Sequence, residues 1–226
     1  MPRLLIIFNI KFMKEYEDFA KLLINPKGST PIYNCLLNIN SEKRNINYNI
    51  ALGQIDASGE KIASNYRFRT GSITKTFTST IILQLMEEGS LKLEDSFLNC
   101  VQNDETKKLL SEILFFDTIN YSSQITVKNL LQHKSGLRDC FADDGRFFAD
   151  IKKYPNRDWN WNNILEKYFK YNLHKKGLFK PGESFYYSDT NYVLLAIIIE
   201  EITSKKYSEV LEERILNPLS LNDTYL

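Results

Sequence analysis

The sequence has few of the residues that build metal centres and disulfide frameworks. It holds only 2 histidines and 3 cysteines among its 226 residues. The cysteines are odd in number and widely spaced, so they indicate neither a metal-ligand pattern nor a disulfide framework; they are Cys35, Cys100 and Cys140. With His133 and His174 as the only imidazoles, a zinc site is not expected. We therefore expect no metal and no cofactor.

The chain also lacks an excess of charge of either sign and lacks a long apolar run. It carries 29 basic and 28 acidic side chains, which argues against nucleic acid or an anionic membrane as the main partner. No apolar stretch is long enough to span a bilayer, so we expect no transmembrane segment. Residues 3–10 reach only the lower limit of a signal peptide, and no small-residue cleavage site follows them. The compartment stays unassigned.

Length and composition indicate a globular chain. Hydrophobic residues make up 43% of the sequence, and the length suffices for one large domain with its own core. We expect residues 1–29 to form a lead-in and residues 30–226 to form the domain. Within the lead-in, residues 13–25 favour a short amphipathic helix. The apolar side of that helix would carry Tyr16, Phe19, Leu22 and Leu23.

Residues 32–39 and 45–53 predict two strands that pair as an antiparallel hairpin, with residues 40–44 as the loop. Residues 45–50 alternate strictly between polar and apolar side chains, which is typical of a half-buried strand. An isolated hairpin is not stable in water. We therefore expect helices to cover one face of the sheet, among them a strongly apolar helix over residues 190–203.

A serine and a lysine stand three residues apart at the start of an apolar run. Ser72 and Lys75 would share one face of a helix. Residues 75–88 predict a largely buried helix, and Gly89 follows where a left-handed C-cap belongs. The apolar stripe of this helix would include Ile73, Phe77, Ile81, Ile82, Leu83, Leu85 and Met86.

This spacing suits nucleophilic catalysis. A serine hydroxyl attacks only when a base takes its proton, and a lysine is a base only when its pKa is lowered. Ser72 as a helix N-cap is the competing interpretation. The same spacing recurs at Ser58 and Lys61, within a polar run that predicts a turn.

The rest of the chain is mainly helical in its pattern. Residues 91–96 predict a short exposed connection, and Thr126 and Gly136 mark the start and the end of one helix. Further helices are expected over residues 106–115, from 157, over 190–202 and over 206–216.

Four stretches resemble one family, the serine β-lactamases and penicillin-binding proteins, in its class C-like branch. Residues 66–77 are similar to the nucleophile segment, and residues 125–137 to the helix and loop between motifs. Residues 179–183 resemble the turn before the second motif, and residues 187–192 resemble that motif, Tyr-x-Asn, with its helix. The resemblance implies an α+β fold, an α/β sandwich of the β-lactamase/transpeptidase-like type: an N-terminal antiparallel hairpin, then a mostly helical region.

The resemblance also implies roles for residues. Ser72 would be the acylated nucleophile, Lys75 would keep its proton path poised, and Tyr187 would be the general base. This is chemically consistent, because a lysine ammonium favours a neighbouring phenolate, and the two groups would titrate as a unit. Apart from the resemblance, a core tyrosine with a satisfied hydroxyl is the better interpretation of Tyr187.

The chain departs from the family pattern at Asp189, where the second motif usually has asparagine. An ionised carboxylate only accepts hydrogen bonds, whereas an amide also donates to a substrate carbonyl. We expect Asp189 to contact the substrate, to bind Lys75 tightly and raise its pKa, and to disfavour turnover of typical β-lactams.

The second departure is the third motif, Lys-Thr-Gly or His-x-Gly, which does not follow Tyr187 in these residues. Lys134, Ser135 and Gly136 have a similar composition, but they precede Tyr187, so we interpret them as a chance match. We expect the chain to be a truncated member that lacks the C-terminal sheet strands. A complementing C-terminal segment or chain is then an expected partner.

Three functions stay open. The first is a serine hydrolase of the β-lactamase, D-Ala-D-Ala carboxypeptidase or esterase type, acting on amide or ester bonds of small molecules or peptides. The second is a non-catalytic remnant or penicillin-binding module. The third is an unrelated helical scaffold. Members of the family are often periplasmic or secreted.

Overall fold

A computed structural model describes residues 2–154, 156–157 and 159–226, with side chains from residue 13 onward. Contacts divide the chain into two compact units, Met1–Arg69 and Thr70–Leu226. The predicted division into residues 1–29 and 30–226 concerns family membership rather than contacts, and it stays a prediction.

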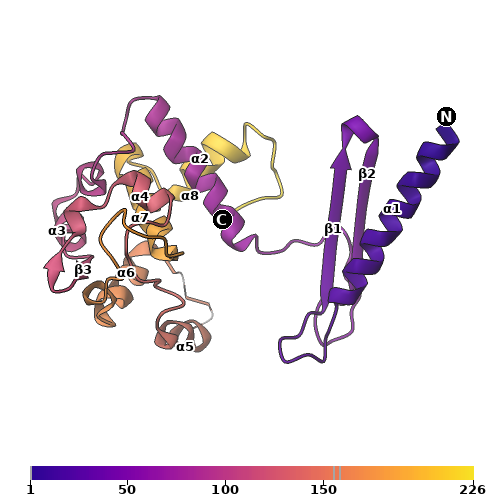
Figure 1. Cartoon of the computed structure of the whole chain (residues 1–226), viewed down its shortest axis with the longest axis horizontal. Helices are drawn as coiled ribbons and strands as arrows, with labels where there is room; N and C mark the ends of the chain where they lie inside the picture. Colours follow the sequence, from indigo (N-terminus) through magenta and orange to yellow (C-terminus); the bar gives the residue numbers. More distant parts are fainter. Residues whose placement is uncertain (1, 155, 158) are drawn as a thin grey trace. The chain divides into compact units, whose positions relative to one another are not determined.

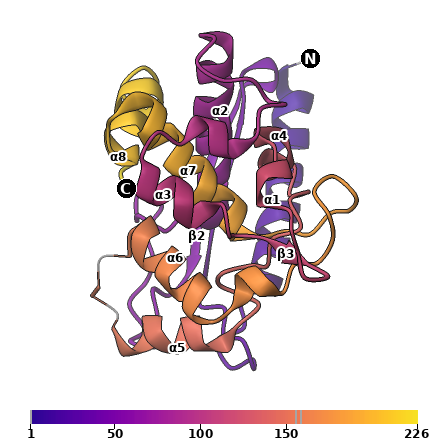
Figure 2. The ribbon, with the colours of Figure 1, turned by 90° about the vertical axis from the view of Figure 1, so that its left-hand side faces the viewer.

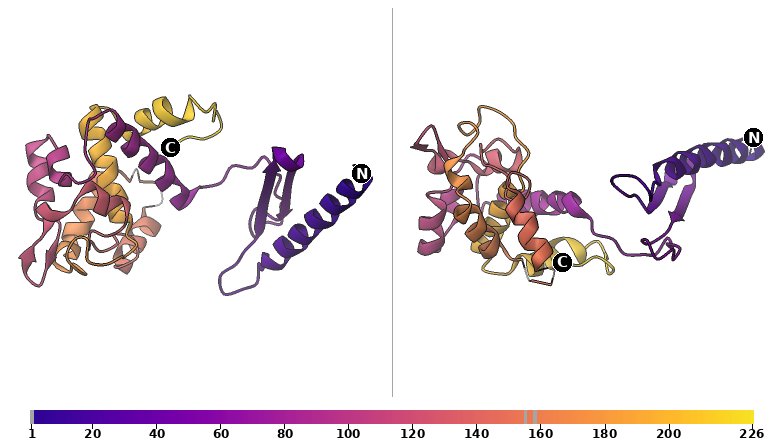
Figure 3. Two further views of the ribbon diagram at one scale, coloured as in Figure 1. Left: turned by 45° about the horizontal axis from the view of Figure 1, so that its top comes forward. Right: turned by 90° about the horizontal axis from the view of Figure 1, so that it is seen from below.

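The first unit consists of helix α1 (Pro2–Leu23) and the strands β1 (Asn34–Ser41) and β2 (Ile46–Gly53). The strands pair antiparallel from Asn34 opposite Gly53 to Ser41 opposite Ile46. Figure 3 shows the two strands side by side in both of its views. The predicted hairpin is confirmed, with β1 displaced by two residues. Along β2, Ile46, Tyr48 and Ile50 are more buried than the asparagines between them, as the alternation predicts.

Helix α1 packs on this hairpin through a side that the sequence did not predict. Ala20 is 3% exposed, and the Tyr48 hydroxyl donates a hydrogen bond of 3.2 Å to the Glu17 carboxylate. The predicted helix is confirmed, but its apolar side is not the side in contact: Phe19 and Leu22 are 61% and 81% exposed, and Tyr16 and Leu23 are also exposed. The contact with the hairpin is thus made through a small side chain and a polar one.

The thin core of the first unit leads to a prediction about solubility. Among its described side chains, only Ala20 and Ile46 are buried apolar residues. Two strands with exposed backbone edges and an exposed apolar helix side favour association. We expect the 226-residue chain alone to aggregate or to need a partner, measured by size-exclusion chromatography with light scattering. A monodisperse, highly stable monomer would contradict this.

The second unit is built around helix α7 (Asp189–Thr203), which contacts α2 (Thr74–Glu87), α4 (Val127–Leu131) and α8 (Tyr207–Leu211). Figures 1 and 2 show α7 beside α2 in both views. Consecutive turns of α7 are buried on several sides, at Leu194, Leu195, Ile197, Ile198 and Ile199. The remaining elements are α3 (Asp104–Leu110), β3 (Phe115–Phe116), β4 (Ile119–Asn120), α5 (Gly145–Lys153) and α6 (Trp161–Lys170).

The predicted apolar helix over residues 190–203 is therefore confirmed as the centre of this core. We also expected this helix to cover a face of the hairpin sheet. Helix and hairpin belong to different units, so that contact stays a prediction. The predicted helix over 206–216 is α8 followed by a π-helical turn, Glu212–Leu216.

Helix α2 buries a narrower stripe than the sequence predicts. Thr78, Ile81, Ile82 and Leu85 are buried, at the spacing of one helix face. Ile73 and Leu83 are 59% and 42% exposed, so their predicted place in the stripe is wrong. Residue 83 lies about 200° around the helix from residue 81, on the opposite side.

Gly89 ends helix α2 as predicted. Its φ is 76°, and its backbone N–H donates to the Met86 carbonyl at 3.0 Å. The N–H of Ser90 donates to the Leu85 carbonyl at 2.9 Å, which completes a Schellman motif.

Other predicted elements need correction. Helix α3 ends at Leu110, and Phe115 belongs to strand β3 rather than to a helix. The connection after α2 is not fully exposed, because Leu91 is 4% exposed and belongs to the core.

Thr126 caps α4 as predicted, accepting from the Asn129 N–H at 3.1 Å.

Gly136 is not the end of α4, which stops at Leu131. It has φ 83°, and a Cβ there would lie 2.0 Å from the Phe179 carbonyl oxygen. Its own carbonyl accepts from the Leu178 N–H at 2.9 Å. Gly136 therefore lets the backbone at Phe179 lie against the loop that follows α4. A larger residue at position 136 would collide with the Phe179 carbonyl group.

Replacing this glycine tests the packing. We expect Gly136→Ala to lower the free energy of unfolding by about 3 kcal/mol, since a left-handed backbone strains an L-residue and the clash is with backbone. Gly145→Ala is the matched control, since nothing lies within 4 Å of its Cβ position. Urea denaturation measures both variants, and equal stabilities would count against this account.

Candidate active site

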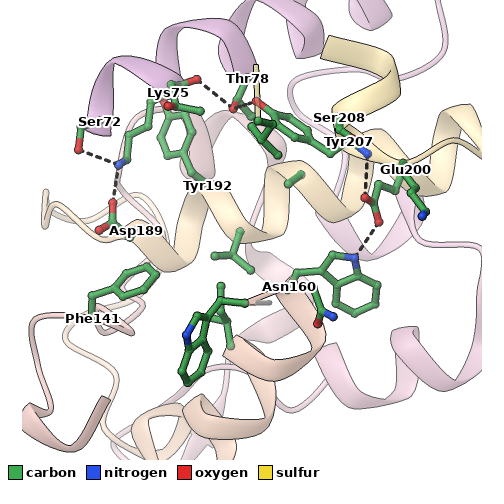
Figure 4. Close-up of a pocket in the computed structure, with 18 of the residues that line it drawn as sticks. Ser72, Lys75, Thr78, Phe141, Asn160, Asp189, Tyr192, Glu200, Tyr207 and Ser208 are labelled. Atoms are coloured by element: carbon green, nitrogen blue, oxygen red, sulfur yellow. Dashed lines mark hydrogen bonds and ion pairs between the residues drawn. The ribbon is translucent and has the colours of Figure 1, made fainter. Parts of the chain in front are cut away.

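The side chains of Ser72, Lys75 and Tyr187 meet at one point in the second unit. The Tyr187 hydroxyl donates to Ser72 Oγ at 2.8 Å, and Lys75 Nζ donates to the same oxygen at 3.2 Å. Ser72 is exposed, so a ligand can reach it. Figure 4 shows Ser72 and Lys75 at the start of helix α2. The structure thus brings together the three residues that the sequence analysis selected.

Ser72 does not cap helix α2, so the N-cap interpretation is wrong. It lies in the middle of a 3-10 turn, Gly71–Ile73, and Ile73 is the cap residue, with no side-chain cap bond. Gly71 has φ 55°, a conformation that glycine adopts without strain. The Ser72 hydroxyl is therefore directed at Lys75 and Tyr187 instead of at the helix backbone.

Tyr187 and Asp189 flank the N-cap residue of α7, Ser188. The Asp189 N–H donates to the Asp139 carboxylate at 2.5 Å. Asp139 is 3% exposed and also accepts from the backbone N–H groups of Phe141 and Ala142. A buried carboxylate at a helix N-terminus is favoured by the helix dipole, and here it holds the start of α7 in place.

Asp189 forms an ion pair with Lys75, and the side chains are 30% and 17% exposed. Burial acts to lower the pKa of Lys75, but the hydrogen bond from Lys75 to Asp189, followed by the contact with Tyr187, raises this pKa overall. The direction agrees with the expectation for a carboxylate at this position. Lys75 is therefore a cation at neutral pH and cannot accept the Ser72 proton in this arrangement.

A cavity of about 790 Å³ opens beside these residues. Ser72, Lys75 and Asp189 line one part of it, and large aromatic side chains line much of the remainder (Figure 4). The aromatic residues are Phe141, Trp159, Trp161, Tyr192 and Tyr207. They come from several elements, and sequence reasoning did not select them.

Sequence reasoning also missed His133, whose ring stacks on Tyr187 with 4.5 Å between ring centres. One signal in the sequence could have indicated it: His133 lies within residues 125–137, one of the four stretches that resemble the family. The sequence analysis weighs this histidine only as a zinc ligand. Within the described residues, no three His, Cys, Asp or Glu side chains form a metal-binding group.

The two chance matches have structural roles. Ser135 is 1% exposed, and its hydroxyl donates to Asn191 Oδ1 at 2.5 Å. Ser58 lies in a turn, where its N–H donates to Asp56 at 2.7 Å and Gly59 has φ 86°. Neither serine has the environment of Ser72.

Residues 44–226 match the family described as Beta-lactamase, so the chain belongs to that family. It is 30% identical over 168 residues to the protein flp of Staphylococcus aureus strain MW2. It is 29% identical over 188 residues to penicillin-binding protein 4* of Bacillus subtilis strain 168. These alignments cover 73% and 81% of this chain but only 29% and 36% of the two relatives.

Solved structures agree on the fold. A D-stereospecific amidohydrolase from Streptomyces sp. matches with a TM-score of 0.62 and 29% identity, over 78% of this chain and 47% of that one. An octameric penicillin-binding protein homologue from Pyrococcus abyssi matches with a TM-score of 0.59 and 30% identity, over 77% and 36%. The mixed α/β fold of the β-lactamase and transpeptidase type is confirmed. In the part of the chain that the structure describes, no helix combines the length and apolarity that crossing a membrane requires.

Proposed function

We propose that this chain carries the nucleophile of a serine hydrolase, which cleaves an amide or ester bond through an acyl-enzyme on Ser72. One observation carries the proposal: an exposed serine hydroxyl lies 2.8 Å from a tyrosine oxygen and 3.2 Å from a lysine nitrogen. A serine held against a base and oriented by a third group is the signature of an activated nucleophile.

Tyr187 is the proposed base. Lys75 is held as a cation by Asp189, so the Ser72 proton passes to the Tyr187 oxygen in its phenolate form. The Lys75 nitrogen lies 4.9 Å from the centre of the Tyr187 ring, so a positive charge stands beside the proposed base during the transfer. Once Ser72 has attacked the carbonyl carbon, Tyr187 returns the proton to the leaving amine or alcohol. Water then hydrolyses the acyl-enzyme with Tyr187 again as base.

The proposed substrate is a small amide or ester whose acyl part carries a large apolar group. The aromatic lining of the cavity beside Ser72 supports this choice, as apolar walls with a few polar groups are typical of small-molecule sites. The similarity to a D-stereospecific amidohydrolase supports amides of D-amino acids as the first compounds to test. Contact of Asp189 with the substrate remains part of the proposal.

Covalent labelling tests the nucleophile. We expect a fluorophosphonate or a fluorescent penicillin to label the full chain, and we expect Ser72→Ala to abolish the label, because only an activated serine reacts with these probes. Ser58→Ala is the matched control, since Ser58 has the same spacing to a lysine but lies in a turn. Gel fluorescence and mass spectrometry of the labelled peptide measure the outcome. Absence of labelling in the unmodified chain would instead support the non-catalytic remnant.

A further inference from the structure

His133 makes three contacts that converge on Tyr187. The residue is 8% exposed, and its ring stacks on the Tyr187 ring with an interplanar angle of 25°. Its carbonyl oxygen accepts from the Tyr186 N–H at 3.0 Å, and its Nδ1 accepts from the Ser188 N–H at 3.2 Å. One residue therefore binds the backbone on both sides of Tyr187 and supports its ring.

The hydrogen bond at Nδ1 defines the charge state of the imidazole. A backbone N–H is always a donor, so Nδ1 must be unprotonated and the proton must be on Nε2. The Asn191 amide nitrogen also lies 3.2 Å from Nδ1, while its amide oxygen accepts from the Ser135 hydroxyl. This orientation of Asn191 directs a second donor at Nδ1. A protonated imidazolium would lose both bonds.

Tyr187 needs such support because it is 45% exposed while its hydroxyl must stay on Ser72. A displacement of about 1 Å at a reacting group can cost a hundredfold in rate. Small changes in the Tyr187 backbone would therefore have large effects on proton transfer.

We propose that His133 is a positioning residue, which in its neutral form clamps the backbone around Tyr187 and holds the phenol oxygen on Ser72. The proposal rests on the proposed function of Ser72. It requires the neutral charge state of a residue that acts on the reaction through Tyr187 rather than by its own proton transfer.

The surroundings of His133 favour the neutral ring. Burial lowers the pKa of His133, and the Lys75 ammonium lowers it further, against the opposing effects of Asp189 and Asp139. The aromatic groups that face the ring are Tyr187, Tyr192 and Phe185. Because the folded-state pKa lies below the ordinary value of 6.5, the unfolded chain takes up the proton first. Stability should therefore decrease as pH falls through 6.5.

Two substitutions separate the contacts of His133. His133→Asn places an amide oxygen close to the position of Nδ1, so it keeps an acceptor for Ser188 but removes the stacked ring. Asparagine also tolerates the left-handed backbone of residue 133, whose φ is 55°. His133→Phe keeps a ring for Tyr187 but removes the acceptor.

The first measurement is the rate of Ser72 labelling by a fluorophosphonate over a range of probe concentrations. We expect His133→Phe to lower the maximal rate by about tenfold or more, and His133→Asn by less, with the half-saturating concentration changed by less than about twofold. Unfolding midpoints establish that both variants are folded. Labelling of either folded variant at the wild-type maximal rate would overturn the proposal. If His133→Phe does not fold, His133→Asn decides.

The second measurement does not depend on activity. Long-range ¹H–¹⁵N spectra of the imidazoles, assigned with His174→Gln, should show the neutral Nε2–H form of His133 from pH 8 to 7, which follows from the acceptor role of Nδ1. A proton on Nδ1, or an imidazolium at pH 7, would overturn the proposal. If the unmodified chain is not labelled at all, the proposed function fails separately. The ¹³C signals of the Tyr187 ring then decide, and an unchanged signal in His133→Asn would overturn the clamp.

Discussion

Replacing Lys75 with methionine is expected to slow acylation of Ser72 by at least about a thousandfold. Lys75 donates to Ser72 Oγ at 3.2 Å and lies over the Tyr187 ring, so its positive charge stands beside both groups between which the proton moves. Methionine keeps much of the length of the side chain but removes the charge. The measurement is the rate of fluorophosphonate labelling at saturating probe.

Two further variants make this result specific. Lys75→Met leaves the Asp189 carboxylate without its ammonium partner, which can disturb the site by itself. The double variant Lys75→Met/Asp189→Asn removes that unpaired charge, and the loss of rate should persist in it. Lys61→Met, from the turn with the same spacing, should label at the wild-type rate. Recovery of labelling in the double variant would contradict a catalytic role for the Lys75 charge.

Asp189→Asn is expected to increase nitrocefin hydrolysis by about tenfold or more, because the new amide can donate to the acylamino carbonyl of a β-lactam. The carboxylate of Asp189 can only accept, and in the structure it is engaged with Lys75. The substitution also removes the strongest of the contributions that raise the pKa of Lys75. Both changes bring the site nearer to the asparagine pattern that the family resemblance implies.

The comparison is the initial rate of nitrocefin hydrolysis before and after the substitution, at equal protein concentration. Asp144→Asn serves as the control, because Asp144 is the N-cap of α5 and asparagine caps helices as well as aspartate does. Its rate should equal that of the unmodified chain. No gain in Asp189→Asn, or a loss, would count against the idea that Asp189 disfavours β-lactam turnover.

The same ion pair predicts a pH dependence of stability. The folded-state pKa of Lys75 lies above its ordinary value of 10.5, so the pair stabilises the fold fully below pH 10.5. This contribution is lost as pH rises through the folded pKa. Urea denaturation should therefore give a smaller difference between the unmodified chain and Asp189→Asn above that pH than at pH 8. A difference independent of pH would contradict the assignment.

The elements that the sequence predicted well have local causes. Residues 45–50 alternate with the period of a strand, and β2 pairs with β1 as that pattern requires. Gly89 ends α2 and Thr126 begins α4. Each does so through a hydrogen bond to a residue three positions away. The three-residue spacing of Ser72 and Lys75 is likewise local, and the resemblance to a family added Tyr187 and Asp189.

The elements that were predicted wrongly depend on contacts that are distant in sequence. The pattern of α1 indicated an apolar side, but the contact with the hairpin is made through Ala20 and Glu17. A glycine at position 136 is typical of a helix end. In the structure, its positive φ instead accompanies the close approach of the Phe179 backbone. The apolar pattern of one segment cannot predict either contact, because the other partner lies elsewhere in the chain.

By itself the sequence determined the type of its main elements, its membership of a known family and the four residues of the candidate site. These depend on spacing, capping and alternation, which act over a few residues. Only the tertiary structure decided that Ser72 is exposed and does not cap α2, that aromatic side chains line the cavity beside it, and that His133 binds the backbone on both sides of Tyr187. Those properties arise where α2, α7 and the end of α4 meet, because burial, charge and hydrogen-bond direction at one atom depend on all of its neighbours in space.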